Sequence, residues 1–279
     1  MSNRGLFAEG VSFSYAGGPP VLNAVTAHIP RGGLVGILGP NGSGKTTLLR
    51  LLAGLLRPTA GRVVLDDADL RTFSRAAIAR RMAMVPQETQ LAFEYTVLEM
   101  AMMGRYPHLG AFEIEGPGDL AVAREALRAT GTQHLESRLF NTLSGGEKQR
   151  VVIAGALSQL ENRSGKNGVV PPFLLLDEPT ASLDLAFQLE IRSILQKLND
   201  DRQLTIAIST HDLNLAASLC RELILLDHGT VLAAGSTASM LDGGLIRKLY
   251  GVEVDISTNS RTGRPVVVPV ARVERAPLP

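Results

Sequence analysis

The eight residues GPNGSGKT, at positions 39–46 and here called the phosphate loop, have types and spacing suited to binding phosphate. Glycine lets backbone N–H groups turn inward and leaves no Cβ to block an anion. Lys45 can donate a charge-assisted hydrogen bond to the β- and γ-phosphates of a nucleotide, and Thr46 offers a hydroxyl ligand for Mg²⁺. A glycine-rich turn that binds nothing is the alternative, but the full pattern is rare by chance. The residues expected to contact nucleotide are Gly39, Asn41, Gly42, Ser43, Gly44, Lys45, Thr46 and Thr47.

Two adjacent carboxylates, Asp177 and Glu178, follow the apolar run FLLL at 173–176. Open parallel sheets place their ligands at the carboxyl ends of strands. Asp177 is suited to holding Mg²⁺, directly or through water, and Glu178 to polarising an attacking water as general base. Taken alone, Asp-Glu-Pro after a strand is usually a solvated turn. Together with the phosphate loop, the pair predicts nucleotide hydrolysis.

Gln87 and His211 also come shortly after apolar runs. The amide of Gln87 could sense Mg²⁺ or water, and His211 could reach a γ-phosphate from the same sheet edge. The plainer alternatives are a turn residue after Pro86 and an ordinary surface or capping histidine. The other motifs favour a catalytic role for both residues.

The run LSGGEKQR at 143–150, here called the SGG segment, opens a second predicted helix. Ser144 and Glu147 fit a capping box, in which each side chain accepts a hydrogen bond from the other residue's backbone. The cap does not explain Gly145 and Gly146, because successive glycines destabilise a helix unless something approaches its backbone closely. A helix N-terminus without Cβ atoms is a phosphate site. One chain thus carries two half-sites, which two copies arranged head to tail would complete.

Strands and helices must bring these groups together. Short apolar runs predict buried strands, and longer helical patterns separate several of them. Between 185 and 198, Phe187, Ile191 and Leu195 recur on one face of an amphipathic helix. Strands that alternate with helices imply an α/β fold with a mostly parallel sheet. The predicted strands are 34–38, 62–65, 82–85, 173–176 and 204–209, and 223–227 with 230–233 form a predicted hairpin.

The stretch from about 91 to 160 has a different pattern. It is rich in Ala, Leu and Met at helical spacing, which predicts a helical subdomain inserted in the α/β core. The polar stretch 162–172 predicts a surface loop. We expect one domain at 1–250, followed by a tail at 251–279 that alternates at 265–270 and has a loose end.

Composition limits the possible partners. The 279 residues include 28 Lys and Arg against 27 Asp and Glu, a net charge of +1, so no positive excess exists to hold a nucleic acid. The single cysteine, Cys220, and a start without a long apolar run indicate a cytosolic protein. No apolar run approaches the length of about 20 residues that crosses a bilayer. Any membrane role is therefore expected to depend on a partner.

In their order along the chain, these motifs resemble the ATP-binding subunits of ABC transporters, over roughly residues 5–250. The resemblance implies the ABC ATPase fold: a P-loop NTPase core with an N-terminal antiparallel β part and the inserted helical subdomain. It implies ATP and Mg²⁺ as cofactors and an ATP-hydrolysing activity, with Thr46, Gln87 and Asp177 at the metal. It places Tyr15 under adenine, where an exposed strand aromatic is the alternative. It also implies that the loop 182–184 belongs to the site, with Asp184 near nucleotide. The sequence departs from the family at Glu147, where Gln is more usual.

Two further segments, GRYPH at 104–108 and LDLAFQ at 183–188, are similar to the branch that serves iron-siderophore, haem and cobalamin importers. This resemblance implies a second copy of the chain, transmembrane permease subunits and, indirectly, a substrate-binding protein as partners. The segment 95–108, with its adaptable Met side chains, would face the permease. The protein would then lie on the cytoplasmic face of the cell membrane.

A non-transport ABC ATPase that acts on nucleic acid or the ribosome is the alternative. Such proteins generally carry long coiled coils or two tandem nucleotide domains, and this sequence shows neither pattern. A regulator that binds nucleotide without turnover is disfavoured, because binding alone would not require Glu178.

Overall fold

The structure is a computed structural model that describes residues 4–89, 91–161, 171–181 and 183–273. The chain divides into two compact units, one formed by 1–70 with 207–279 and the other by 71–206. Most of the predicted loop at 162–172 lies outside the described residues, as does Ser182 of the predicted loop 182–184.

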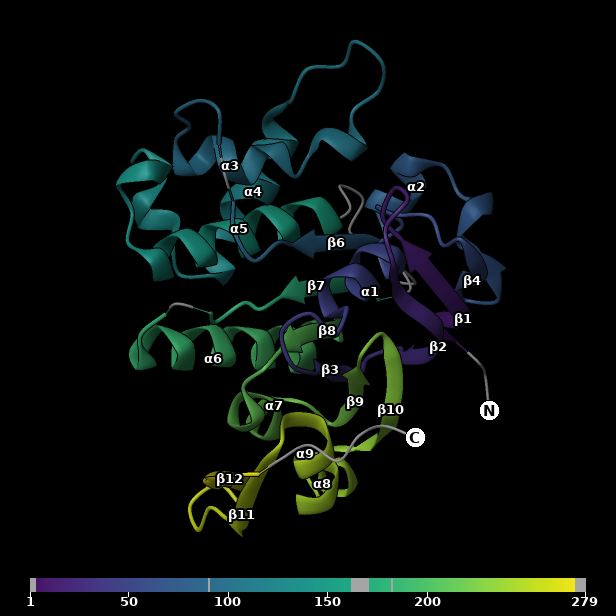
Figure 1. Ribbon diagram of the computed structural model, residues 1–279. Coiled ribbons are helices and arrows are strands. Elements are labelled where there is room, and N and C mark those ends of the chain that lie inside the picture. Colours follow the sequence, from purple (N-terminus) through teal and green to yellow (C-terminus); the bar gives the residue numbers. More distant parts are fainter. Residues whose placement is uncertain (1–3, 90, 162–170, 182, 274–279) are drawn as a thin grey trace. The chain divides into compact units, whose positions relative to one another are not determined.

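The first unit contains a four-stranded antiparallel sheet in the order β2-β1-β4-β5. Leu6 of β1 lies opposite Ile29 of β2 on one side and Leu65 of β4 on the other, and all three side chains are buried. The predicted strand at 62–65 belongs to this sheet (Figure 1). The bounds are β1 Gly5–Ser14, β2 Pro20–Pro30, β4 Ala60–Leu65 and β5 Ala68–Asp69.

A second set of strands in this unit has the order β10-β9-β3-β8, and β8 carries the chain across the boundary between the units. Every residue of β3 is buried, as its continuous apolar run predicts for a parallel strand covered on both faces. Leu38 of β3 pairs in parallel with Leu225 of β9, and β9 turns back into β10 as the predicted hairpin. The bounds are β3 Leu34–Leu38, β8 Thr205–Thr210, β9 Glu222–Asp227 and β10 Thr230–Ser236.

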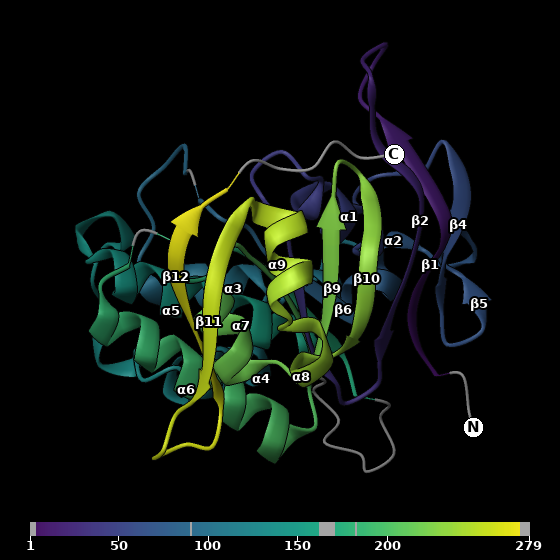
Figure 2. The ribbon, with the colours of Figure 1, turned by 60° about the horizontal axis from the view of Figure 1, so that its bottom comes forward.

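The helices of the first unit are followed by a two-stranded sheet at the end of the described chain. Figure 2 shows α9 alongside β11, and the two elements are in contact. The stretch predicted as a tail therefore forms a regular hairpin as far as Arg272, and residues 274–279 lie outside the described chain. The bounds are α1 Lys45–Leu52, α7 Leu213–Leu219, α8 Thr237–Met240, α9 Gly243–Tyr250, β11 Val252–Thr258 and β12 Pro265–Arg272.

The second unit contains parallel strands β6 and β7 in the order β8-β7-β6, with helices around them. Helices α3, α4 and α5 pack on one another, and between 97 and 160 the described chain forms helices and turns, with one isolated β-bridge from Leu139 to Thr96 (Figure 1). These are the elements that the composition of this stretch predicts. The bounds are β6 Met82–Val85, β7 Phe173–Asp177, α2 Arg75–Ala79, α3 Val97–Met103, α4 Pro117–Ala129, α5 Gly145–Leu160 and α6 Leu185–Arg202, with short 3₁₀ turns at Leu70–Thr72, Tyr106–His108, Gln133–Leu135 and Phe140–Thr142. The predicted α/β class, with a mostly parallel sheet and an antiparallel β part, is confirmed.

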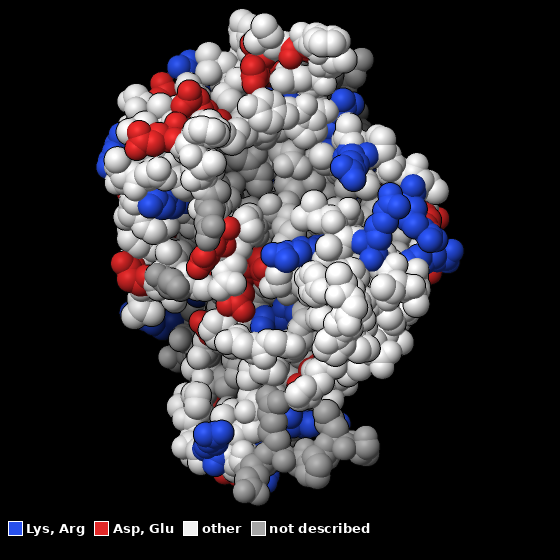
Figure 3. All heavy atoms as spheres, turned by 45° about the horizontal axis from the view of Figure 1, so that its top comes forward, with Lys and Arg blue, Asp and Glu red and all other residues white. Residues whose placement is uncertain are grey.

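Charge on the surface is mixed. The face drawn in Figure 3 carries both basic and acidic side chains in separate small groups, without one continuous basic surface. Across the described ranges, no helix combines the length and the apolar character needed to cross a membrane.

Candidate functional site

The phosphate loop joins the end of β3 to the start of α1, in the first unit. Gly42 and Gly44 have φ angles of +80° and +100°, in the region that favours glycine. A Cβ on Gly39 would lie 2.2 Å from Leu226 O, so this glycine is required by packing inside the fold. A Cβ on Gly42 would meet nothing within 4 Å, so the backbone there faces open space. The loop therefore offers an uncovered cradle of the kind that accepts phosphate oxygens.

Two polar side chains of the loop point into it. Lys45 is 5% exposed and donates from Nζ to Gly39 O at 2.9 Å and to Pro40 O at 3.2 Å. The Ser43 hydroxyl is buried and, within the described part of the chain, makes no hydrogen bond. An unsatisfied buried hydroxyl is unusual in a protein, because it loses water without gaining a partner. A buried ammonium and an unsatisfied hydroxyl at a helix N-terminus fit a bound anion.

Tyr15 follows β1 and lies beside the start of α1. Its hydroxyl is 3.2 Å from Thr47 Oγ1, and its ring meets the ring of Phe13 edge-on at 4.9 Å between centroids. The side chain is 43% exposed, so one part of it is fixed by the fold while another remains available for stacking. The role under adenine stays a prediction.

His211 follows β8 in the first unit, and its side chain is exposed. The next residue, Asp212, caps α7: its Oδ1 accepts from the backbone N–H of Asn214 at 2.8 Å and of Leu215 at 3.0 Å. The side-chain amide of Asn214 in turn pairs with both backbone groups of Val267, at 3.0 and 2.8 Å. Strand β12 is thus bound to the helix that follows His211. The sequence gives no local signal for this contact.

Asp177 and Glu178 stand at the carboxyl end of β7, in the second unit. Asp177 is buried, and Glu178 has a φ of +46°, which is uncommon for a residue with a side chain. Such conformations cost on the order of 1–3 kcal/mol and gather at functional sites. Val85 of β6 lies opposite Leu176, and Gln87 and Glu178 each stand two residues further along. The structure therefore brings Gln87 and the carboxylate pair to the same edge of this parallel pair of strands.

The SGG segment starts α5, also in the second unit, with the predicted capping box. The Ser144 hydroxyl accepts from Glu147 N at 3.3 Å, and Glu147 Oε2 accepts from Ser144 N at 2.8 Å. The donated backbone N–H lowers the pKa of the Glu147 carboxyl. Gly145 is exposed, whereas Gly146 is buried.

The two glycines of this segment meet different surroundings. A Cβ on Gly145 would come no closer than 3.5 Å to Leu183, an ordinary contact, so this position is open. A Cβ on Gly146 would lie 2.3 Å from the ring of Phe187. The ring of Phe187 therefore fills the space beside Gly146, and the expected contact of this glycine with nucleotide stays a prediction.

Asp184 begins α6 and caps it, because its Oδ1 accepts from Phe187 N at 3.0 Å. Gln188 Nε2 donates to Leu183 O at 2.9 Å and closes the same turn. The carboxylate of Asp184 is exposed. Its contact with nucleotide stays a prediction.

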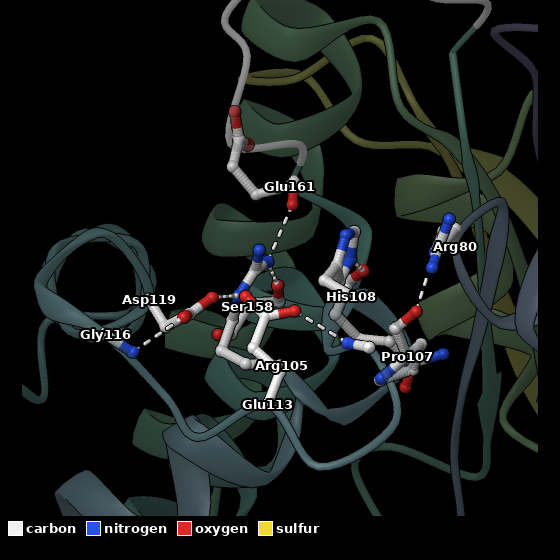
Figure 4. A network of polar contacts seen from close by, with 11 residues as sticks. Arg80, Arg105, Pro107, His108, Glu113, Gly116, Asp119, Ser158 and Glu161 are labelled. Atoms are coloured by element: carbon white, nitrogen blue, oxygen red, sulfur yellow. Dashed lines mark hydrogen bonds and ion pairs between the residues drawn. The ribbon is translucent and has the colours of Figure 1, made fainter.

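A buried network at the other end of α5 holds the segment that follows α3 (Figure 4). Arg105 is fully buried, forms an ion pair with Asp119 at 3.1 Å, and donates to the carbonyl oxygens of Ser158 and Glu161. His108 Nε2 donates to Gln159 O at 2.7 Å, and burial lowers the pKa of this imidazole. Cations near the last carbonyls of a helix stabilise it, and here Arg105 does so.

The donor types of the predicted metal set fit Mg²⁺, since Thr46, Gln87 and Asp177 offer hydroxyl, amide and carboxylate oxygens. Among the described residues, no group of three or more His, Cys, Asp or Glu side chains is placed to hold a metal ion. The first unit thus holds Tyr15, the phosphate loop and His211, and the second holds Gln87, the SGG segment and the carboxylates Asp177, Glu178 and Asp184.

Known proteins with similar sequences are transport ATP-binding proteins. The cobalamin import ATP-binding protein BtuD of Halobacterium salinarum is 41% identical over 253 residues, which cover 91% of this chain but 61% of that relative. The hemin import ATP-binding protein HmuV of Bordetella pertussis is 39% identical, covering 86% of this chain and 90% of the relative. The ferric enterobactin transport ATP-binding protein FepC of Escherichia coli is 36% identical, covering 90% and 89%.

Solved structures agree. An ABC transporter in an inward-facing conformation is similar with a TM-score of 0.81 and 28% identity, over 96% of this chain and 98% of that one. A bacterial ABC transporter cassette solved as a dimer has a TM-score of 0.70 and 29% identity, over 83% and 98%. The family model described as ABC transporter matches residues 22–181, more than half of the chain. This match and the similar transport proteins show that the chain belongs to the ABC transporter family.

Proposed function

We propose that the chain is the ATP-hydrolysing subunit of an importer, and that two copies pair head to tail around two ATP molecules. The observation that carries this proposal is the phosphate loop, with an open backbone at Gly42, a buried Lys45 ammonium and an unsatisfied Ser43 hydroxyl. A buried cation, an unsatisfied hydroxyl and an open backbone together suit a polyanion.

The residues of the chain divide the chemistry among them. Lys45 and the backbone N–H groups of the loop bind the phosphates, and Tyr15 stacks on the base. Glu178 accepts a proton from the attacking water, while Gln87 and His211 orient that water and the γ-phosphate. Mg²⁺, held through Thr46, Gln87 and Asp177, would neutralise charge that develops on the phosphate oxygens.

Pairing of two copies is supported by the second helix start. The SGG segment presents the exposed Ser144 and Gly145 at the N-terminus of α5, where backbone N–H groups and the helix dipole favour an anion. A single chain needs one phosphate cradle for one nucleotide and carries two. The similar cassette that was solved as a dimer gives a precedent for such pairing. Closure on ATP and opening after hydrolysis would form the working cycle.

The cargo that we propose is a cobalamin, haem or iron-siderophore type of compound, after the names of the similar transport proteins. The chain would act on the cytoplasmic face of the membrane, through permease subunits that meet the segment 95–108. Purification of the chain from its own cells should bring down a helical membrane protein. Recovery of ribosomal RNA or DNA instead would favour the non-transport alternative, which mixed surface charge does not support.

The variant Glu178→Gln tests the proposal. Loss of the general base should slow ATP hydrolysis by about 10²–10⁴, while ATP still binds and holds two chains together. Phosphate release and light scattering with ATP measure the two effects, and Glu222→Gln at the exposed start of β9 is a matched control. Near-normal turnover in Glu178→Gln would remove Glu178 from the base role.

A further inference from the structure

The ring of Phe187 occupies the place where Gly146 lacks a side chain. An ideal Cβ built on Gly146 would lie 2.3 Å from Phe187 Cγ and Cδ1 and 2.8 Å from Cδ2. Real Cβ atoms do not come this close to other heavy atoms, so either the ring or the helix would have to move. The missing side chain of Gly146 thus makes room for the ring of Phe187, and this packing joins the start of α5 to the start of α6.

Phe187 is itself held through its backbone and through its ring. Its backbone N–H donates to Asp184 Oδ1 at 3.0 Å, which fixes it to the first turn of α6. The Arg150 guanidinium lies over its ring at 5.9 Å from the centroid, within the range of a cation–π contact. Arg150 also forms an ion pair with Glu190 at 3.3 Å, one turn further along α6. The ring, carried by α6, therefore packs against Gly146 and Arg150 at the start of α5.

The neighbouring Gly145 provides the contrast. It is exposed, and its nearest neighbour for an added Cβ, Leu183 Cδ2, would be at 3.5 Å. Of the two glycines, only Gly146 is buried. Gly145 and the Ser144 hydroxyl are left facing outward.

We propose that Phe187 is a positioning residue that makes Asp184 and the SGG segment one rigid body. Under the proposed function, on which this inference rests, both groups face nucleotide in the paired state. Phe187 then sets the spacing between them, and neither can shift toward the second copy without the other. The missing side chain at Gly146 leaves the space that the ring of Phe187 fills.

A double-mutant cycle on the full chain tests the packing part of the proposal. Gly146→Ala alone should lower the melting temperature, because the new methyl group collides with the ring. In the Phe187→Ala background the same change should be neutral or raise the melting temperature, because alanine favours a helix over glycine. An equal loss from Gly146→Ala in both backgrounds would overturn the match between the two residues.

The positioning part is tested by ATP-driven pairing in chains that also carry Glu178→Gln. Phe187→Ala should weaken pairing, measured by light scattering, at least about tenfold, whereas binding of a fluorescent ATP analogue to the single chain should change by less than about twofold. Phe187→Tyr retains the ring and should pair like the parent, as should the control Phe93→Ala at a side chain that is 71% exposed.

Each result of the pairing experiments either supports or contradicts the positioning role of Phe187. Full pairing by Phe187→Ala, or equal loss by Phe187→Tyr and Phe187→Ala, would overturn the positioning role. Failure of the Glu178→Gln parent itself to pair with ATP would contradict the proposed function, and the melting-temperature cycle would still settle the packing of Gly146 against Phe187.

Discussion

Lys45 combines two duties in one side chain. Its ammonium donates to two carbonyl oxygens of the phosphate loop, so it stabilises the loop that it is expected to share with phosphate. A charged donor in so buried a place is stronger than the same donor at the surface, because little water competes for it. The stability of the loop and its binding of phosphate should therefore both depend on Lys45.

Lys45→Ala should weaken nucleotide binding by about 10- to 100-fold, since a hydrogen bond to a charged group contributes on the order of 1.5–3 kcal/mol. Titration with a fluorescent ATP analogue measures this loss, and a melting curve of the same sample separates it from unfolding. Lys248→Ala, at an exposed position of α9, is the control. Unchanged affinity in Lys45→Ala would contradict the assignment of the loop.

Glu147 makes the cap of α5 sensitive to acid. Its pKa is lowered from the usual 4.5, because Ser144 N donates to the carboxylate in the folded chain. A lowered folded pKa contributes stability above the unfolded pKa, and that stability is lost as pH falls through the folded value. Glu147→Gln removes the titrating group, so the stability difference between parent and variant should shrink below about pH 4.5. Denaturant unfolding at several pH values measures it, and a difference that does not change with pH would contradict the prediction.

At the scale of elements, α5 is held differently at its two ends. Its N-terminus is capped by its own residues, Ser144 and Glu147, and leaves Gly145 exposed. Its C-terminus is held by side chains from elsewhere, Arg105 and His108, which donate to its last carbonyl groups. The end that is expected to meet nucleotide is therefore held by its own cap and by the packing of Gly146 against Phe187, and the other end is held by the buried network around Arg105.

The ion pair between Arg105 and Asp119 should behave as a buried pair. Arg105→Met leaves the Asp119 carboxylate buried without its partner, a change that typically costs about 3–5 kcal/mol. The double variant Arg105→Met, Asp119→Asn should lose less than the single one, because no charge is then left buried. Urea unfolding measures both, with Arg75→Met at an exposed position of α2 as control. If the double variant loses as much free energy of unfolding as Arg105→Met and Asp119→Asn lose together as single variants, the two residues act independently.

At the scale of the whole molecule, the proposed function requires two chains. Ser144→Arg places a bulky cation at the exposed start of α5 and removes a cap that contributes about 1 kcal/mol. The chain should still fold and bind nucleotide but should no longer pair with ATP. Light scattering of Ser144→Arg with Glu178→Gln measures this, and Ser257→Arg at an exposed position of β11 is the control. Persistent ATP-dependent dimers would refute the shared site.

Much of the fold could be predicted, because its signals are local. Strands β3 and β6 end where their apolar runs end, and the capping box of α5 is formed within four consecutive residues. The phosphate loop is likewise a continuous motif between a strand and a helix. Family resemblance added Tyr15 and Asp184, whose neighbours in the sequence alone say little about them.

The features that could not be predicted depend on residues far apart in the chain. The bond between Asn214 and Val267 joins residues 53 positions apart, and Gly146 meets Phe187 only after two helices have packed. The burial of Arg105 likewise depends on carbonyl groups at the far end of α5. No periodicity or composition reports such contacts.

The length of α5 has a mechanical consequence. Its 16 residues, at about 1.5 Å each, put roughly 24 Å between the end beside Arg105 and the end at Ser144. A tilt of about 5° about the end beside Arg105 would move Ser144 by about 2 Å, enough to make or break a hydrogen bond. Under the proposed role of Phe187, Asp184 would move together with Ser144.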